Sequence, residues 1–221
     1  MVENRENGLD ELRDTVRRSV EEKRDIQAEV REITLKALGE RELDRNRIRA
    51  VAEAVMQGAG EALERESEQL KRGLGEAAAG LEEALIKAAD ALRLAIEEAA
   101  GRVNEFSTGD LKRSLDDLDN LEAVFLEALQ RAAKGGGEMV RTIMGEMASH
   151  ARNSGTSVGQ HVARNMEQLH NRMRELGTET AGAGEEAANR IGQVARGILA
   201  GVAGTLLHIA EGDRRQRDGR S

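Results

Sequence analysis

The sequence predicts an all-α protein, an elongated bundle of about six long amphipathic helices that is partly coiled-coil. Three observations carry this prediction. The 221 residues include no Pro, the residue that most strongly breaks helices. Ala, the best helix former, occurs 32 times. Apolar residues recur along most of the chain at intervals of three and four residues. Because Val, Ile, Leu and Phe together number only 47, the expected core is thin and rich in Ala.

The first region, residues 1–39, is predicted to form one coiled-coil-like helix. Its apolar seam has a period of about 3.5 residues, and the polar residues Ser19 and Lys23 interrupt it. The helix is expected to end at Gly39, since Gly readily takes the left-handed conformation that closes helices. The seam residues expected to form an interface with a second copy or a partner are Leu9, Leu12, Val16, Ile26, Val30 and Ile33.

The second region, residues 40–134, is acidic and rich in Ala and Leu. Asp44 is a candidate N-cap, and the apolar pattern that follows it has the period of a straight helix as far as Phe106. A single helix over 44–106 would be about 95 Å long. We therefore expect the chain to turn back at a group of glycines, Gly73, Gly75 and Gly80.

Another helix is expected to complete this region. Ser107 and Asp110 have the spacing of a capping box, and apolar residues then repeat on one face up to Ala132. Three consecutive glycines, 135–137, should end it.

The third region, residues 135–212, is rich in Gly and Met. Five of the seven Met lie between 139 and 173, a stripe that suits either an ordinary core or an adaptable binding surface. The segment 153–155 predicts a kink or a division, and a last helix is expected from about 185 to 211. A ridge of small residues in it would allow close contact with a soluble helix, or shallow contact with a membrane or granule: Gly197, Gly201 and Gly204. Residues 213–221 are predicted to be a disordered Arg-rich tail.

Three short motifs resemble catalytic or cofactor signatures. Residues 155–159 match GxSxG, which functions only at a strand-to-helix turn, and no strand is expected before it. Residues 73–78 and 182–187 match GxGxxA without the required strand, so we interpret them as helix junctions. Glu167 and His170 form one ExxH, whereas a di-iron bundle needs two such motifs and two further Glu. We predict no catalytic residue, no cofactor and no metal.

Composition excludes several classes of protein. Without Cys the chain has no disulfide and no thiolate metal ligand. A net charge of −8 and the absence of Tyr and Trp disfavour nucleic-acid binding. The amino-terminal residues lack the apolar core of a secretory signal, and the longest uncharged stretch, 197–210, is shorter than the ~20 residues that span a bilayer. A cytoplasmic location is expected.

Three stretches of the chain, 41–55, 106–118 and 150–162, resemble an uncharacterised family of bacterial all-helical proteins. This resemblance covers roughly residues 25–165 and implies no chemistry. In composition alone the chain is also similar to phasins, amphipathic proteins that coat polyester storage granules. That similarity implies a role at a granule surface.

The sequence thus predicts a non-enzymatic structural or interaction protein that acts by self-association or partner binding. A thin core favours this hypothesis, since pairing with another copy would bury more apolar area per chain. The alternative is a phasin-like coating of a hydrophobic granule, lipid or membrane surface. A third hypothesis, a metal-dependent enzyme using Glu167 and His170, has only the single ExxH in its favour.

Overall fold

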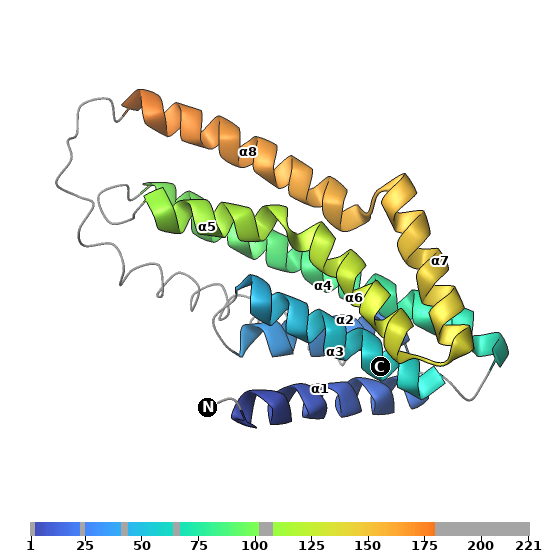
Figure 1. Ribbon diagram of the computed structural model, residues 1–221. Helices are drawn as coiled ribbons and strands as arrows, with labels where there is room; N and C mark the ends of the chain where they lie inside the picture. Colours follow the sequence, from blue (N-terminus) through green and yellow to red (C-terminus); the bar gives the residue numbers. More distant parts are fainter. Residues whose placement is uncertain (1–2, 23–24, 41–43, 64–66, 102–107, 180–221) are drawn as a thin grey trace, which may run out of the picture.

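The computed structural model describes residues 3–22, 25–40, 44–63, 67–101 and 108–179, and these residues form an all-α bundle (Figure 1). The bundle is drawn out along its helix axes, as expected for an elongated molecule. Within the described residues there are eight helices, namely α1 (Glu3–Glu21), α2 (Ile26–Gly39), α3 (Arg45–Leu63), α4 (Ser67–Gly101), α5 (Thr108–Asp119), α6 (Leu121–Gly135), α7 (Glu138–Ser154) and α8 (Ser157–Glu179).

The helices are arranged around α3 and α4, which lie next to each other in the middle of the bundle. On one side α1 packs on α3 and α2 packs on α4. On the other side α6 packs on α3, and α8 packs along α4. In Figure 1, α1 and α8 lie at opposite edges of the bundle and α7 crosses one of its ends. With 35 residues, α4 is the longest described helix and contacts both sides.

One hydrophobic core runs through the described helices. Its largest fully buried side chains are mostly Leu and Ile, and Ala occupies many of the remaining positions, as the composition predicts. Large apolar side chains with substantial exposure are confined, among the described residues, to Leu94 at 51% and Met139 at 48%. The described part of the chain therefore buries its apolar faces within a single copy.

The single helix predicted for residues 1–39 is in fact two helices. Asp25 accepts a hydrogen bond at 3.2 Å from the backbone N–H of Ala28 and so begins α2 as its N-cap. The seam spacing places Ser19 at the core position near the end of α1. In the structure Val20 is fully buried there, and Ser19 is only half-buried. The seam therefore does not continue as one coiled-coil helix. The expected end at Gly39 is confirmed.

The break expected within residues 44–106 exists, but the predicted position was wrong. Asp44 caps α3 by accepting a hydrogen bond at 2.8 Å from the N–H of Arg47, as expected. That helix ends at Leu63, and α4 runs without interruption through Gly73, Gly75 and Gly80. These glycines are therefore part of a helix, and residues 73–78 are not a helix junction.

Two helix glycines are explained by close packing between helix backbones. A Cβ added to Gly80 would collide with the carbonyl oxygen of Gln27 in α2. A Cβ added to Gly58 would collide in the same way with the carbonyl oxygen of Arg13 in α1. Glycine at these positions lets α4 approach α2, and α3 approach α1, more closely than any side chain would allow.

Ion pairs and hydrogen bonds lie beside these close contacts and connect neighbouring helices. Glu83 of α4 accepts hydrogen bonds from Gln27 at 2.6 Å and from Arg31 at 3.1 Å, both on α2. Between α3 and α6, Arg131 pairs with Glu53 at 3.0 Å and Arg49 with Glu127 at 2.9 Å. Partly exposed pairs of this kind contribute little individually, ~0.2–1 kcal/mol, and serve mainly to set how the helices are aligned.

The later boundaries agree with the sequence in most cases. The glycines at 135–137 separate α6 from α7, and the division expected at 153–155 separates α7 from α8. Gly155 has φ of +78°, a conformation that side-chain-bearing residues rarely adopt. The helix expected from 107 onwards divides at Asn120, while Ser107 lies outside the described residues.

Replacing Asp117 with Asn should stabilise the protein above about pH 4. Burial, and next the nearby charge of Asp44, raise the pKa of Asp117 above its ordinary value of 3.8. Ionisation therefore costs folding free energy as the pH rises through the raised pKa, whereas below 3.8 the carboxyl is protonated in both states and costs nothing. Since the side chain is only half-buried, the expected gain is at most about 0.5 kcal/mol at pH 7.

Urea unfolding of both proteins at pH 3 and pH 7 measures this effect. The control is Asp119→Asn, in the same last turn of α5 but exposed. An equal gain for both variants at pH 7, or a gain for Asp117→Asn that persists at pH 3, would contradict the assignment.

Candidate functional site

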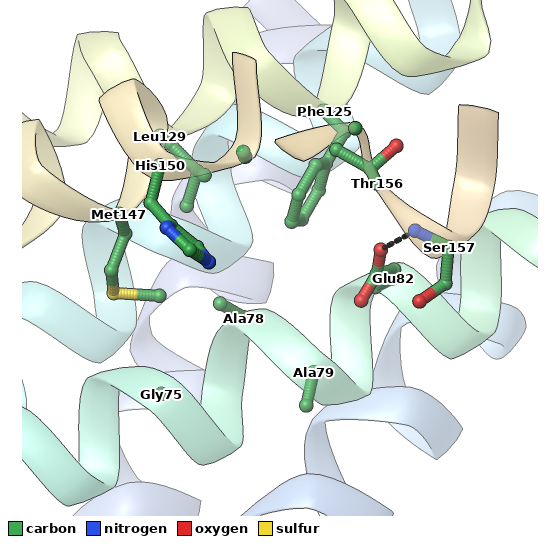
Figure 2. A pocket seen from close by; sticks show the side chains of 12 residues that line it. Gly75, Ala78, Ala79, Glu82, Phe125, Leu129, Met147, His150, Thr156 and Ser157 are labelled. Atoms are coloured by element: carbon green, nitrogen blue, oxygen red, sulfur yellow. Dashed lines mark hydrogen bonds between the residues drawn. The ribbon is translucent and has the colours of Figure 1, made fainter. Parts of the chain in front are cut away.

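A cavity of about 270 Å³ lies where the beginning of α8 meets α4, α6 and α7 (Figure 2). In Figure 2, Met147 and His150 of α7 lie on one side, and Phe125, Thr156 and Ser157 on the other. Small residues of α4 form the floor, Gly75, Ala78 and Ala79. The cavity is therefore mostly apolar, with polar groups at its edges.

Two carboxylates from other helices hold the first turn of α8. Glu122 of α6 accepts hydrogen bonds from the backbone N–H of Thr156 at 3.2 Å and from its hydroxyl at 2.8 Å. Glu82 of α4 accepts from the N–H groups of Ser157 at 2.6 Å and Val158 at 3.3 Å. These N–H groups have no partners within the helix, and its dipole favours negative charge at this end.

Thr156 caps the N-terminus of α8 with its own side chain. Its hydroxyl oxygen accepts a hydrogen bond at 2.8 Å from the N–H of Gly159, which is the geometry of an N-cap. The side chain is 5% exposed, so these bonds are largely shielded from water. The turn at Gly155 and the cap at Thr156 together set the direction in which α8 leaves α7.

One helical turn further on, a second polar contact joins α8 to α4. Asp90 lies 2.6 Å from Nε2 of His161 and also accepts a hydrogen bond at 3.3 Å from Asn165, which is 3% exposed. The other ring nitrogen of His161, Nδ1, lies 3.3 Å from the guanidinium of Arg164. Because a guanidinium only donates hydrogen bonds, Nδ1 is the acceptor from Arg164. Nε2 then carries the hydrogen and donates a hydrogen bond to Asp90.

Ser157, His161 and Asp90 contain the residue types of a hydrolase triad but not its arrangement. Both ring nitrogens of His161 are already in contact, with Asp90 and with Arg164, so neither is left to activate Ser157. The GxSxG segment follows α7 and begins α8, whereas a nucleophile elbow follows a strand. The polar groups around α8 therefore hold helices together.

The other motifs found in the sequence do not assemble into a site among the described residues. Glu167 is exposed on α8, and the side chain of His170 and residues 182–187 lie outside the described part. No group of three or more His, Cys, Asp or Glu within the described ranges could hold a metal ion. Of the Met stripe, Met144 is buried and Met147 and Met166 pack against the core.

The predicted interface residues of the first region lie inside the bundle. Leu12, Val16, Ile26 and Val30 are buried, and Leu9 and Ile33 are partly buried against the same core. A contact between copies through these residues would require α1 and α2 to open. The other three predicted interface residues, Gly197, Gly201 and Gly204, lie outside the described residues.

Sequence reasoning did not find the carboxylates around α8. Glu82 and Glu122 sit in ordinary helical patterns, 74 and 34 residues before Thr156, and nothing local marks them as caps. The residues that donate these hydrogen bonds did carry a signal in the sequence. The sequence Gly155-Thr156-Ser157 is typical of a helix start, and the N–H groups of a helix start need acceptors.

No described helix combines the length and the apolarity needed to cross a membrane. A comparison with known proteins found no significant match among curated proteins or solved structures. A family model described as a family of unknown function, DUF6781, matches residues 3–208, which is most of the chain. The resemblance to an uncharacterised all-helical family is thereby confirmed, and the chain belongs to DUF6781.

Proposed function

We propose that the protein is a cytoplasmic, non-enzymatic bundle that acts by binding a second copy of itself or another protein. The observation that supports this most is a contrast within the chain. The described helices bury their own apolar faces, while the sequence still holds 14 consecutive residues without charge, 197–210. An apolar run of this length is stabilised when it leaves water.

The small residues of this run are suited to contact between helices. Gly197, Gly201 and Gly204 are spaced by four and three residues, so they would fall on one face of a helix. Glycine on such a face lets two backbones approach closely, in the way that Gly58 and Gly80 do within the bundle. The proposal therefore assigns association to residues 197–210 and leaves the apolar seam of α1 and α2 to the core.

The role of the polar groups at α8 also supports a binding rather than a catalytic function. Glu82, Glu122 and Asp90 accept hydrogen bonds from backbone and side-chain groups of α8.

The expected result for Gly201→Leu is weaker self-association with an intact fold. Light scattering during size-exclusion chromatography should show the unmodified full-length protein as a dimer or larger at about 10 μM. The variant should dissociate at least about tenfold more readily, a loss of ~1.4 kcal/mol. Gly192→Leu is the control, because it adds the same side chain to the last helix expected from the sequence, outside residues 197–210 and off the ridge of small residues. A monomer at all concentrations for the unmodified protein would refute self-association.

A second candidate, a phasin-like coating of a hydrophobic surface, is favoured by the same uncharged stretch. The Gly201→Leu variant separates the two proposals, because an added Leu weakens a tight helix contact but strengthens binding to an apolar surface. Co-sedimentation of the full-length protein with polyester granules or phosphatidylcholine vesicles measures the second effect. Binding to granules or vesicles that rises in the variant supports coating, and absence of binding by the unmodified protein refutes it.

A further inference from the structure

We propose that the cavity beside the first turn of α8 binds a small organic cation, a protonated amine with a short apolar body. The proposal uses no residue of 197–210 and does not depend on self-association. The cavity volume of about 270 Å³ lies just below the ~300–1,000 Å³ of typical small-molecule pockets. It therefore suits a ligand with fewer than about ten non-hydrogen atoms.

The apolar part of the ligand would lie against the floor and sides of the cavity. Ala78 and Ala79 of α4, Leu129 and Phe125 of α6 and Met147 of α7 provide this surface. Figure 2 shows these side chains around one space, with the phenyl ring and the thioether on facing sides. A short alkyl chain removed from water here gains the hydrophobic effect without needing hydrogen-bond partners.

The charge at the edge of the cavity selects the head group. Glu82 lines the cavity, and its Oε1 accepts both capping bonds from α8 while Oε2 takes part in neither. Glu122 adds a second carboxylate behind Thr156. Two full negative charges exceed the half positive charge of a helix N-terminus. The edge therefore attracts a cation and repels a carboxylate or a phosphate.

His150 lies opposite this acidic edge. It is exposed, and in Figure 2 its imidazole faces the cavity above Ala78. The group at the edge that can contact the head is thus Oε2 of Glu82, an acceptor, and this favours a donor such as –NH₃⁺.

Gly75 leaves the entrance of the cavity open. A Cβ at this position would meet no atom within 4 Å, so the space beside it is empty rather than filled by a neighbouring helix. Packing alone does not require Gly here, in contrast with Gly80 of the same helix. Gly75 lines the cavity, so a larger side chain at this position would occupy part of it.

Titration of the full-length protein with three six-carbon compounds tests the proposal. The probes are n-hexylammonium, n-hexanol and n-hexanoate, which have the same number of carbon atoms and differ in charge. Followed by amide chemical shifts, n-hexylammonium should bind with a Kd of about 1 mM, as expected for a ligand of seven non-hydrogen atoms. Hexanol should bind at least about tenfold more weakly, and hexanoate should not bind. Equal binding of the ammonium and the carboxylate, or no binding of the ammonium at about 20 mM, would overturn the proposal.

Two variants locate the binding. Gly75→Leu fills the cavity without changing any charge and should weaken n-hexylammonium binding at least about tenfold. Its control is Gly145→Leu on the exposed face of α7, where an added Cβ also meets no atom within 4 Å. Glu82→Gln keeps an acceptor for Ser157 but should reduce the ammonium to the affinity of hexanol. Unchanged binding in Gly75→Leu would show that the amine attaches to the acidic surface, and the proposal would be wrong.

Discussion

Replacing Gly80 with Ala is expected to destabilise the protein by about 2–3 kcal/mol, although Ala is the better helix former. The added methyl group would collide with the carbonyl oxygen of Gln27, and a backbone atom cannot rotate away as a side chain can. The α2 and α4 helices would have to separate, which also stretches the hydrogen bonds of Gln27 and Arg31 to Glu83. Urea unfolding followed by circular dichroism measures the change.

The matched control for this prediction is Gly75→Ala, five residues earlier in the same helix. Its added methyl group meets no atom within 4 Å, so only the helix preference remains, and we expect a gain of about 0.5–1 kcal/mol. The two substitutions should therefore change stability in opposite directions. Stabilisation by both would contradict the close contact between α2 and α4.

Replacing Glu122 with Ala is expected to cost about 2 kcal/mol and to loosen α8 first. The substitution leaves the N–H and the hydroxyl of Thr156 without their acceptor, and Thr156 is only 5% exposed. A buried polar group that loses its partner costs about 1–3 kcal/mol. Hydrogen exchange of the amides at 157–160 should accelerate more than exchange in α3.

The control for this second prediction is Glu122→Gln, whose amide oxygen still accepts from Thr156. We expect it to retain most of the stability, with a loss below about 1 kcal/mol, because only the charge is removed. If Gln and Ala cost the same, the carboxylate acts through its charge on the helix dipole rather than through these two bonds. Uniform acceleration across all helices in the Ala variant would show that α8 does not open separately.

The all-α class could be predicted from sequence because it depends on local properties. Absence of Pro and spacing of apolar residues act within one helix, and caps such as Asp44 act within one turn. The divisions at 135–137 and 153–155 were predicted for the same reason. Asp25 was missed because Ser19 and Lys23, which have the spacing of the seam, were interpreted as polar positions within one helix.

The roles of individual glycines could not be predicted, because they depend on distant residues. Gly75 and Gly80 look alike in sequence, yet one faces empty space and the other faces the backbone of α2. The same reasoning applies to the cavity and to the caps of α8. Glu82 and Glu122 are recognised only once α4, α6 and α8 are placed together.

The central position of α4 has a consequence for how this family can vary. Of its side chains described between 71 and 99, those that are exposed are Lys71, Arg72, Lys87, Leu94 and Glu98. Nearly every turn of α4 therefore contacts a neighbouring helix on more than one side. A substitution that suits α2 has to be compatible with α6 or α8 as well. Evolutionary change should accordingly be slowest along α4 and faster on α1 and α7, where one face of the helix contacts no other described helix.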